Sequence, residues 1–148
     1  MFALREPTAT DVGFVVDSWA KCLRTMFERR RKMHGDDYFP WAQGRINALL
    51  ARPKTELRVL GPEGDAWSVE GWACLEGSVL HFVYVASRAR GLGATKLLLG
   101  DRTIAAYSHL TKMIDERRLP ASWQPKLTLG VLRSEERRVG KECLRLCR

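Results

Sequence analysis

The sequence predicts an α/β fold: a mostly antiparallel mixed sheet with flanking helices and one βαβ unit. Three central segments rich in β-branched and aromatic residues are separated only by tight turns, so neighbouring strands must run antiparallel. Two N-terminal stretches carry apolar residues at helical spacing. The segment "LHFVYVASRARGLGATKLLLG", residues 80–100, passes from a strand through a two-glycine turn into a helix, which is how a βαβ unit begins.

The N-terminal elements follow from spacing and capping. "FALREPT", residues 2–8, alternates apolar and polar residues and predicts an edge strand. From about Asp11 to Arg30 the apolar spacing is helical, with the Thr10 hydroxyl as the expected N-cap. "HGDDYFP", residues 34–40, predicts a loop because Gly and Pro punctuate it, and "WAQGRINALLAR", residues 41–52, predicts a second helix.

The central strands are expected at residues 55–61, 67–76 and 79–85. The turn "PEGDA" separates the first two, and a tight hairpin at Gly77-Ser78 joins the second and third. These strands form the antiparallel part of the sheet.

The C-terminal elements complete the βαβ unit. Residues 94 to about 118 predict a long helix, with Tyr107 packed in its middle, and residues 126–132 predict a final strand. Because a helical crossover connects them, that strand should lie parallel and adjacent to strand 80–85.

The composition is that of one soluble domain. The chain has 148 residues, of which 45% are hydrophobic and 28% charged. No apolar run approaches the ~20 residues of a membrane helix, and the N-terminus has no secretory h-region, so a cytoplasmic location without membrane partners is expected. Cys22 and Cys74 are expected to be buried thiols, and no histidine stands near Cys143 and Cys147, so no metal site is expected.

The last residues change the charge balance. "RSEERRVGKEC", residues 133–143, resembles translated read-through of a DNA-sequencing adapter, so we expect a native, C-terminally truncated domain at 1–132 and a non-native tail at 133–148. The tail holds six Lys/Arg and three Asp/Glu, a net of +3, and removing it from +8 leaves +5. This modest, scattered basicity disfavours a nucleic-acid-binding protein.

The glycine turn is the feature that indicates chemistry. A glycine turn before a helix presents unpaired backbone N–H groups and suits an anion such as phosphate. Arg88 and Arg90 are expected to add mobile positive charge at its rim. A Walker A loop does not fit, because no Lys-Ser/Thr follows the last glycine, and a dinucleotide fingerprint would need three glycines.

The segment "VYVASRARGLGATKLL", residues 83–98, resembles the acetyl-CoA binding motif of the GNAT superfamily of N-acetyltransferases, written Arg/Gln-x-x-Gly-x-Gly/Ala. Arg88, Gly91 and Gly93 fill its fixed positions, and Val85 stands where many members carry proline. The opening "LREPTATDVGFVV" also resembles the first strand and helix of the family, with its Arg-x-x-x-x-x-Asp pattern. The resemblance covers about residues 1–132 and implies an acyl-CoA N-acyltransferase-like fold, incomplete at its C-terminus.

The resemblance implies acetyl-CoA as cosubstrate and a set of residues that hold it. The pantetheine arm would pair with the backbone of His81, Val83 and Val85, which are expected to share one face of their strand by period two. The pyrophosphate would lie on the glycine loop. The loop residues implied are Arg88, Ala89, Arg90, Gly91, Leu92, Gly93 and Ala94.

The catalytic residues stay open at this point. Gly77 stands where many members place the general base, and the remaining candidates are His81, Glu76 and Glu70. The tyrosine that often protonates the leaving thiolate would lie beyond the native end of this chain. Asp36 or Asp37, in the loop between the first two helices, is a candidate contact for the amine.

The function implied is transfer of an acetyl group from acetyl-CoA to a primary amine, on a small molecule or a protein. One alternative is a catalytically inactive GNAT-like binding or structural module, of phage or bacterial type. The other is a basic nucleic-acid-binding protein. The acceptor and the oligomeric state are left undecided by the sequence.

Overall fold

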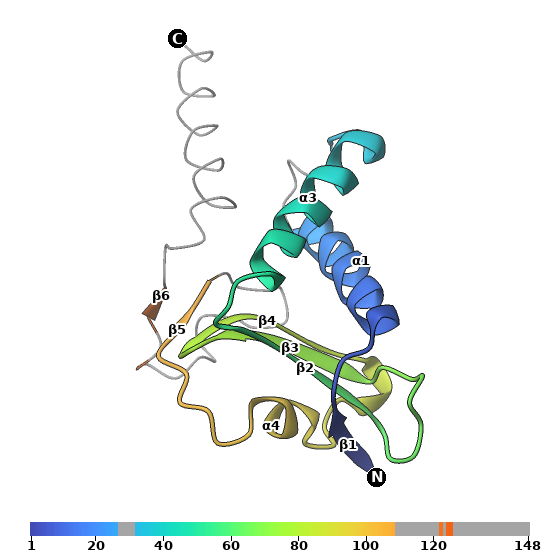
Figure 1. Ribbon diagram of the computed structural model, residues 1–148, viewed down its shortest axis with the longest axis vertical. Helices are drawn as coiled ribbons and strands as arrows, with labels where there is room; N and C mark the ends of the chain where they lie inside the picture. Colours follow the sequence, from blue (N-terminus) through green and yellow to red (C-terminus); the bar gives the residue numbers. More distant parts are fainter. Residues whose placement is uncertain (27–31, 109–121, 123, 126–148) are drawn as a thin grey trace.

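A computed structural model describes residues 1–26, 32–108, 122 and 124–125. Its centre is a sheet in the order β1-β2-β3-β4-β5-β6 (Figure 1). The strands are β1 (Phe2–Arg5), β2 (Thr55–Pro62), β3 (Gly71–Glu76), β4 (Val79–Val85), β5 (Ala106–Tyr107) and β6 (Gln124–Pro125). The helices are α1 (Ala9–Met26), α3 (Gly35–Leu50), the 3₁₀ turn η1 (Ser87–Ala89) and α4 (Ala94–Leu99).

The sheet is mixed and mostly antiparallel. Strands β1 to β4 are antiparallel neighbours, whereas β5 runs parallel to β4, and β6 runs parallel to β5. The chain from β4 through α4 to β5 is a βαβ unit. The fold class predicted from the sequence is therefore confirmed.

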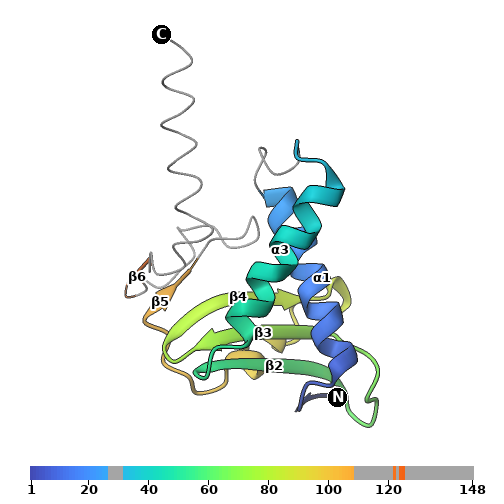
Figure 2. The same cartoon turned by 45° about the horizontal axis from the view of Figure 1, so that its top comes forward.

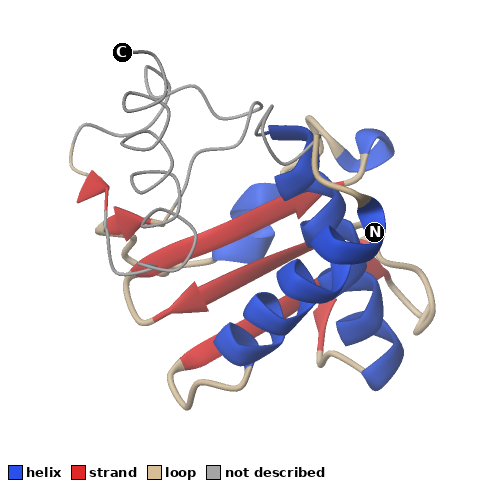
Figure 3. Ribbon diagram, turned by 90° about the horizontal axis from the view of Figure 1, so that it is seen from above, coloured by secondary structure: helices blue, strands red, loops and turns tan. Residues whose placement is uncertain are grey.

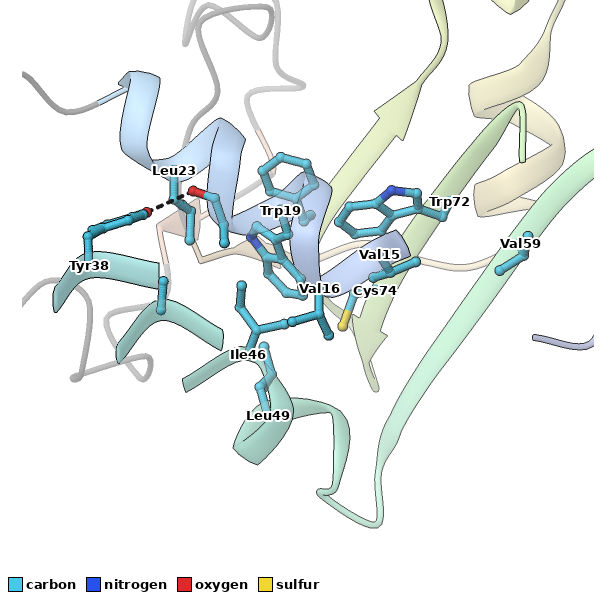
Figure 4. Packing of buried hydrophobic residues seen from close by; sticks show 13 residues of the cluster. Val15, Val16, Trp19, Leu23, Tyr38, Ile46, Leu49, Val59, Trp72 and Cys74 are labelled. Carbon is cyan, nitrogen blue, oxygen red and sulfur yellow. Dashed lines mark hydrogen bonds between the residues drawn. The ribbon is translucent and has the colours of Figure 1, made fainter. Parts of the chain in front are cut away.

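One core lies between the sheet and the pair α1 and α3, which lie side by side across β2, β3 and β4 (Figures 2 and 3). Trp19 of α1 packs against Trp72 of β3, with ring centroids 5.4 Å apart, and Trp72 stacks on Phe82 of β4 at 5.0 Å. Tyr38 of α3 donates a hydrogen bond of 2.8 Å to the carbonyl of Ala20 (Figure 4). The apolar residues of the two N-terminal helical stretches thus face the sheet.

A second core lies on the opposite face, beneath α4. Leu98 of α4 is fully buried there against Leu60, Ala73 and Leu75 of the sheet. Gly71 permits this close approach, because a Cβ there would lie 2.9 Å from the Tyr84 carbonyl oxygen and 3.1 Å from Leu98 Cδ1.

The start of α1 differs from the prediction. The N-cap is Thr8, not Thr10. The Thr8 hydroxyl accepts from the Asp11 N–H at 3.3 Å, and the Asp11 carboxylate accepts from the Thr8 N–H at 2.7 Å. This reciprocal pair is a capping box, which needs a hydroxyl residue three positions before the acidic one, and only Thr8 has that spacing to Asp11.

The predicted loop at residues 34–40 is wrong, because α3 begins at Gly35. The His34 side chain caps the helix by accepting from the Asp36 N–H at 3.4 Å. Asp36 and Asp37 fall in the first turn, where a negative charge favours the helix dipole. Pro40 lies inside the helix, close enough to its start for the prediction to mistake it for loop punctuation.

The predicted long helix is also wrong, because α4 stops at Leu99. Gly100 takes φ 55° and ψ −140°, which ends the helix, and the parallel neighbour of β4 follows as β5. Tyr107 therefore lies in a strand and not in the middle of a helix. The strand predicted to start at Trp67 begins at Gly71. The strand expected at 126–132 and the tail at 133–148 lie outside the described residues.

No helix in the described part of the chain is both long and apolar enough to cross a membrane.

Candidate active site

The first feature of the site is a strand edge that loses its partner. Strand β4 pairs with β3 along its whole length but with β5 only at Val79 and Leu80. Ser108 extends that contact, since its N–H donates to the Leu80 carbonyl at 3.0 Å and its hydroxyl to the His81 carbonyl at 3.1 Å. Beyond His81, no strand among the described residues pairs with this edge of β4.

The backbone groups that face this edge are those of Val83 and Val85. The Ala86 N–H donates to the Glu70 carbonyl at 2.8 Å, so it points toward the β3 side. Because backbone groups in a paired strand point alternately to its two sides, those of Val85 and Val83 point away from β3. The Arg90 Nε accordingly donates to the Val85 carbonyl at 3.2 Å from the other side. The family resemblance implied that these two valines hold the pantetheine arm, and the structure turns their backbone groups to the edge of β4 that lies away from β3.

The second feature is the glycine loop at the end of β4. Gly91 and Gly93 have φ of 78° and 79°, the left-handed region that glycine adopts without strain. A Cβ added to either would meet no atom within 4 Å. In the described ranges, no backbone oxygen accepts from the N–H of Gly91, Leu92 or Gly93. Successive backbone N–H groups without an acceptor are the donors that anion-binding loops use.

The remaining loop residues divide into packed and exposed side chains. Ala89 is fully buried and Ala94 nearly so, whereas Arg90 is exposed and Leu92 is 63% exposed. Helix α4 has only six residues, so any dipole it contributes is small. Attraction of an anion to this loop would therefore come mainly from its own N–H groups.

Arg88 does not supply the mobile charge predicted for it. Its Nε donates to both carboxylate oxygens of Glu70, at 2.8 and 2.6 Å, and its Nη2 lies 2.5 Å from Oε1. The Glu70 side chain is 5% exposed and that of Arg88 70% exposed. The hydrogen bond and charge of Glu70 raise the pKa of Arg88. Glu70 is thus an occupied carboxylate and a poor general base.

The other two base candidates, Glu76 and His81, lie together. His81 Nε2 is 3.0 Å from Glu76 Oε2, and Arg52 Nη1 donates to the same oxygen at 3.2 Å. Burial disfavours the charged form of Glu76, but the hydrogen bond from His81 and the charge of Arg52 outweigh it and lower its pKa. The structure therefore assembles a buried imidazole, a partly exposed carboxylate and a guanidinium beside the point where β4 and β5 part.

The prediction that His81 shares a face with Val83 and Val85 is wrong. The register of β3 and β4 shifts between Cys74 and Leu75, which leaves His81 as an extra residue in β4. A β-bulge of this kind breaks the two-residue alternation of side chains. Val83 and Val85 pack on the α4 side of the sheet, while His81 turns toward Glu76.

Asp36 and Asp37, the expected amine contacts, lie exposed in the first turn of α3. Asp36 Oδ2 is 3.4 Å from His34 Nδ1. No contact described in the structure joins either carboxylate to the β4 edge or to Glu76.

Two ion pairs of the site had no signal in the sequence. Arg88 and Glu70 are 18 residues apart, and Arg52 and Glu76 are 24 apart, so neither spacing marks a pair on one helix. The opening pair Arg5 and Asp11 was visible as part of the family pattern. Its role in the structure is to join β1 to α1 through bonds of 2.5 and 2.8 Å.

The solved structures that match this chain include two proteins that are assigned as acetyltransferases. One is a protein of Desulfovibrio desulfuricans assigned to the GNAT family, with 17% identity and a TM-score of 0.41, covering 68% of this chain and 63% of that one. The other is YncA of Salmonella typhimurium, solved with its cofactor acetyl-CoA, with 17% identity and a TM-score of 0.40, covering 67% of this chain and 59% of that one. This chain thus spans about three fifths of the length of those proteins. No protein-family model and no curated protein matches it.

Proposed function

We propose that this chain is a GNAT-type N-acetyltransferase, with residues 1–132 as the enzyme domain, that transfers an acetyl group from acetyl-CoA to a primary amine. One observation carries the proposal. Beyond His81, an edge of β4 has no neighbouring strand among the described residues, and its Val85 carbonyl accepts from the exposed Arg90 side chain. The same edge ends in a loop whose Gly91 and Gly93 N–H groups have no backbone acceptor in the described ranges. Coenzyme A has an amide-containing pantetheine arm followed by a pyrophosphate. The strand edge would bind the arm, and the glycine loop would bind the pyrophosphate.

The chemistry of coenzyme A fits both parts. The pantetheine arm carries amide groups, which can add to an unpaired strand edge as another strand would. The pyrophosphate is a dianion, which suits the N–H groups of the glycine loop. The exposed Arg90 and Lys96 flank that loop and add positive charge.

The reaction requires a proton acceptor, and Glu76 and His81 are our candidates for it. Acetyl-CoA supplies an activated acyl group. The amine nitrogen forms a bond to the acyl carbon as the carbon–sulfur bond breaks, and the thiol leaves with a proton. The ammonium must first lose a proton, and we propose the Glu76 and His81 pair as its acceptor. Asp36 and Asp37 stay proposed contacts for the acceptor amine.

The test of the proposal compares two glycines. Gly91 and Gly64 have φ of 78° and 80°, and a Cβ on either meets no atom within 4 Å. Alanine at either position therefore costs a similar backbone strain, about 1–2 kcal/mol. Only the Cβ at Gly91 intrudes on the proposed phosphate site.

Titration calorimetry with coenzyme A should give wild-type affinity for Gly64→Ala and at least about tenfold weaker binding for Gly91→Ala, which is 1.4 kcal/mol. The bulkier Gly91→Val should abolish binding in a folded domain. Equal affinities in the wild type and Gly91→Ala, or no binding by the wild type, would contradict the proposal.

The second candidate is a GNAT-like module that binds the cosubstrate without catalysis. It is favoured by Gly77 at the usual base position and by the engagement of Glu70 with Arg88. Release of free thiol from acetyl-CoA, measured with spermidine, lysine and a peptide N-terminus as acceptors, distinguishes the two. Coenzyme A binding with no thiol release above the hydrolysis rate would support the module.

A further inference from the structure

The ion pair of Glu70 and Arg88 joins the residue that precedes β3 to the 3₁₀ turn η1, which leads into the glycine loop. Glu70 is 4% exposed, and Arg88 meets its carboxylate with the Nε donor at 2.6 and 2.8 Å and with Nη2 at 2.5 Å. Bonds of this kind between a guanidinium and a carboxylate are directional and fix geometry as well as charge. The Arg88 side chain is 70% exposed, so it lies on the solvent side of the buried Glu70 carboxylate.

A backbone hydrogen bond also connects Glu70 to the segment that leads into the glycine loop. The Glu70 carbonyl accepts from the Ala86 N–H at 2.8 Å, and the Ala86 carbonyl accepts from the Ala89 N–H at 2.9 Å. Ala89 is fully buried, so its methyl group anchors the turn in the core. Glu70 therefore holds both ends of the segment that leads from β4 into the glycine loop.

We propose that Arg88 is a positioning residue that latches the glycine loop to Glu70, and that it does not contact phosphate itself. The inference rests on the proposed function for its ligand, coenzyme A. On this reading the phosphates meet the N–H groups of Gly91, Leu92 and Gly93, and the latch keeps those groups aligned before the ligand arrives. Preorganised donors cost no ordering entropy at the moment of binding.

The opposite role would require Arg88 to leave Glu70 for the phosphate. That exchange would leave the Glu70 carboxylate buried with its charge unpaired, which is strongly unfavourable. The two roles predict opposite effects for Glu70→Gln. If Arg88 binds phosphate, this change frees the arginine, removes a nearby negative charge, and leaves coenzyme A binding equal or tighter. If Arg88 is a latch, the change loosens the loop and weakens binding.

The experiment uses the full chain with Glu70→Gln, Arg88→Gln, the double variant, and Asp17→Asn as control. The control Asp17→Asn also removes one carboxylate charge, from an exposed pair with Lys21 on α1 that does not involve the glycine loop. We expect each single latch variant to weaken coenzyme A binding at least about tenfold, because the loop must then be ordered when the ligand binds. The double variant should be no weaker than the weaker single, because both remove one interaction. Asp17→Asn should bind as the wild type does.

Amide hydrogen exchange of the ligand-free chain tests the latch without any ligand. Exchange of the hydrogen-bonded amides of Ala86, Ala89 and Arg90 should rise at least about tenfold in Glu70→Gln and Arg88→Gln, and not in Asp17→Asn. Unchanged exchange there, in chains whose circular dichroism and thermal unfolding show them folded, would overturn the latch. Glu70→Gln binding coenzyme A as tightly as the wild type would also overturn it. A wild type that binds no coenzyme A would sink the proposed function, while the exchange data would still decide the latch.

Discussion

At the scale of residues, each buried carboxylate or imidazole in the described part of the chain is bonded to another ionisable side chain. The buried carboxylate and imidazole side chains among the described residues are Asp11, Glu70 and His81, bonded to Arg5, Arg88 and Glu76 respectively. Removing one partner of such a pair costs more than the pair contributes, because the other charge stays buried. Each pair also joins two elements, so single side chains fix how the elements meet.

Asp11→Asn tests the pair at the start of α1. The bond to Arg5 holds the pKa of Asp11 well below its usual range. Since the folded pKa is lowered, the stabilisation is present above the unfolded pKa of about 4 and is lost as the pH falls. We expect Asp11→Asn to lower the free energy of unfolding by about 1.5–3 kcal/mol at pH 7. Urea denaturation should show that difference shrinking below pH 4, and a constant difference down to pH 2 would contradict the ionic role.

Cys74 offers a check on the core between the helices and the sheet. It is fully buried, and burial first, then the charge of Glu76, raises its pKa to about 12. A thiol in this state is a poor nucleophile at neutral pH. We expect Cys74 to escape alkylation by iodoacetamide at pH 8 in the folded chain and to react once urea unfolds it, as mapped by peptide mass spectrometry. Rapid alkylation of Cys74 in the folded chain would show that this core is not closed.

At the scale of elements, strand β4 positions both parts of the proposed coenzyme A site, the strand edge and the glycine loop. It shares one edge with β3, leaves β5 after two residue pairs, and ends in η1 and the glycine loop. Helix α4, with six residues, is too short to be stable alone and depends on its packing against the sheet. That packing is tightest at Gly71, under Leu98.

Gly71→Ala is therefore expected to destabilise the fold. Its Cβ would lie 2.9 Å from a backbone oxygen of β4, and overpacking of this kind costs about 1–3 kcal/mol. Gly44→Ala is the control, because a Cβ there meets no atom within 4 Å and alanine favours the interior of α3 by about 1 kcal/mol. Thermal unfolding should rank the chains Gly44→Ala, wild type, Gly71→Ala in falling order. A Gly71→Ala chain as stable as the wild type would contradict the close packing of Gly71 against both β4 and α4.

At the scale of the molecule, the sequence predicted the antiparallel meander, the Gly77-Ser78 hairpin and the strand–glycine–helix order of the site. Those features depend on local signals: alternation, turn residues and helical spacing. The predictions that were wrong concern segments with an ambiguous local signal, or contacts between residues that lie far apart in the sequence. Pro40 suggested a loop but lies in α3, and apolar residues beyond Gly100 suggested helix where β5 forms.

The site itself was predictable in its backbone and not in its side chains. The order of strand, two-glycine turn and helix start follows from local residue types in one stretch of sequence, and the family resemblance implied the edge of β4 at Val83 and Val85. The face of His81 depends on a β-bulge, and the partner of Arg88 depends on tertiary packing. Neither leaves a mark in the spacing of residues along the chain.

The most direct test of the proposed site is which backbone amides respond to coenzyme A. In a ¹⁵N-labelled chain, nuclear magnetic resonance during a titration with coenzyme A should shift the amide signals of Val83, Val85, Gly91 and Gly93, because these N–H groups gain acceptors. The amide of Gly44, on the opposite side of α3 from the core, should keep its position. Saturable shifts confined to the β4 edge and the glycine loop are the expected result. A chain whose β4 and loop amides stay unchanged at saturating coenzyme A would contradict the proposed binding site.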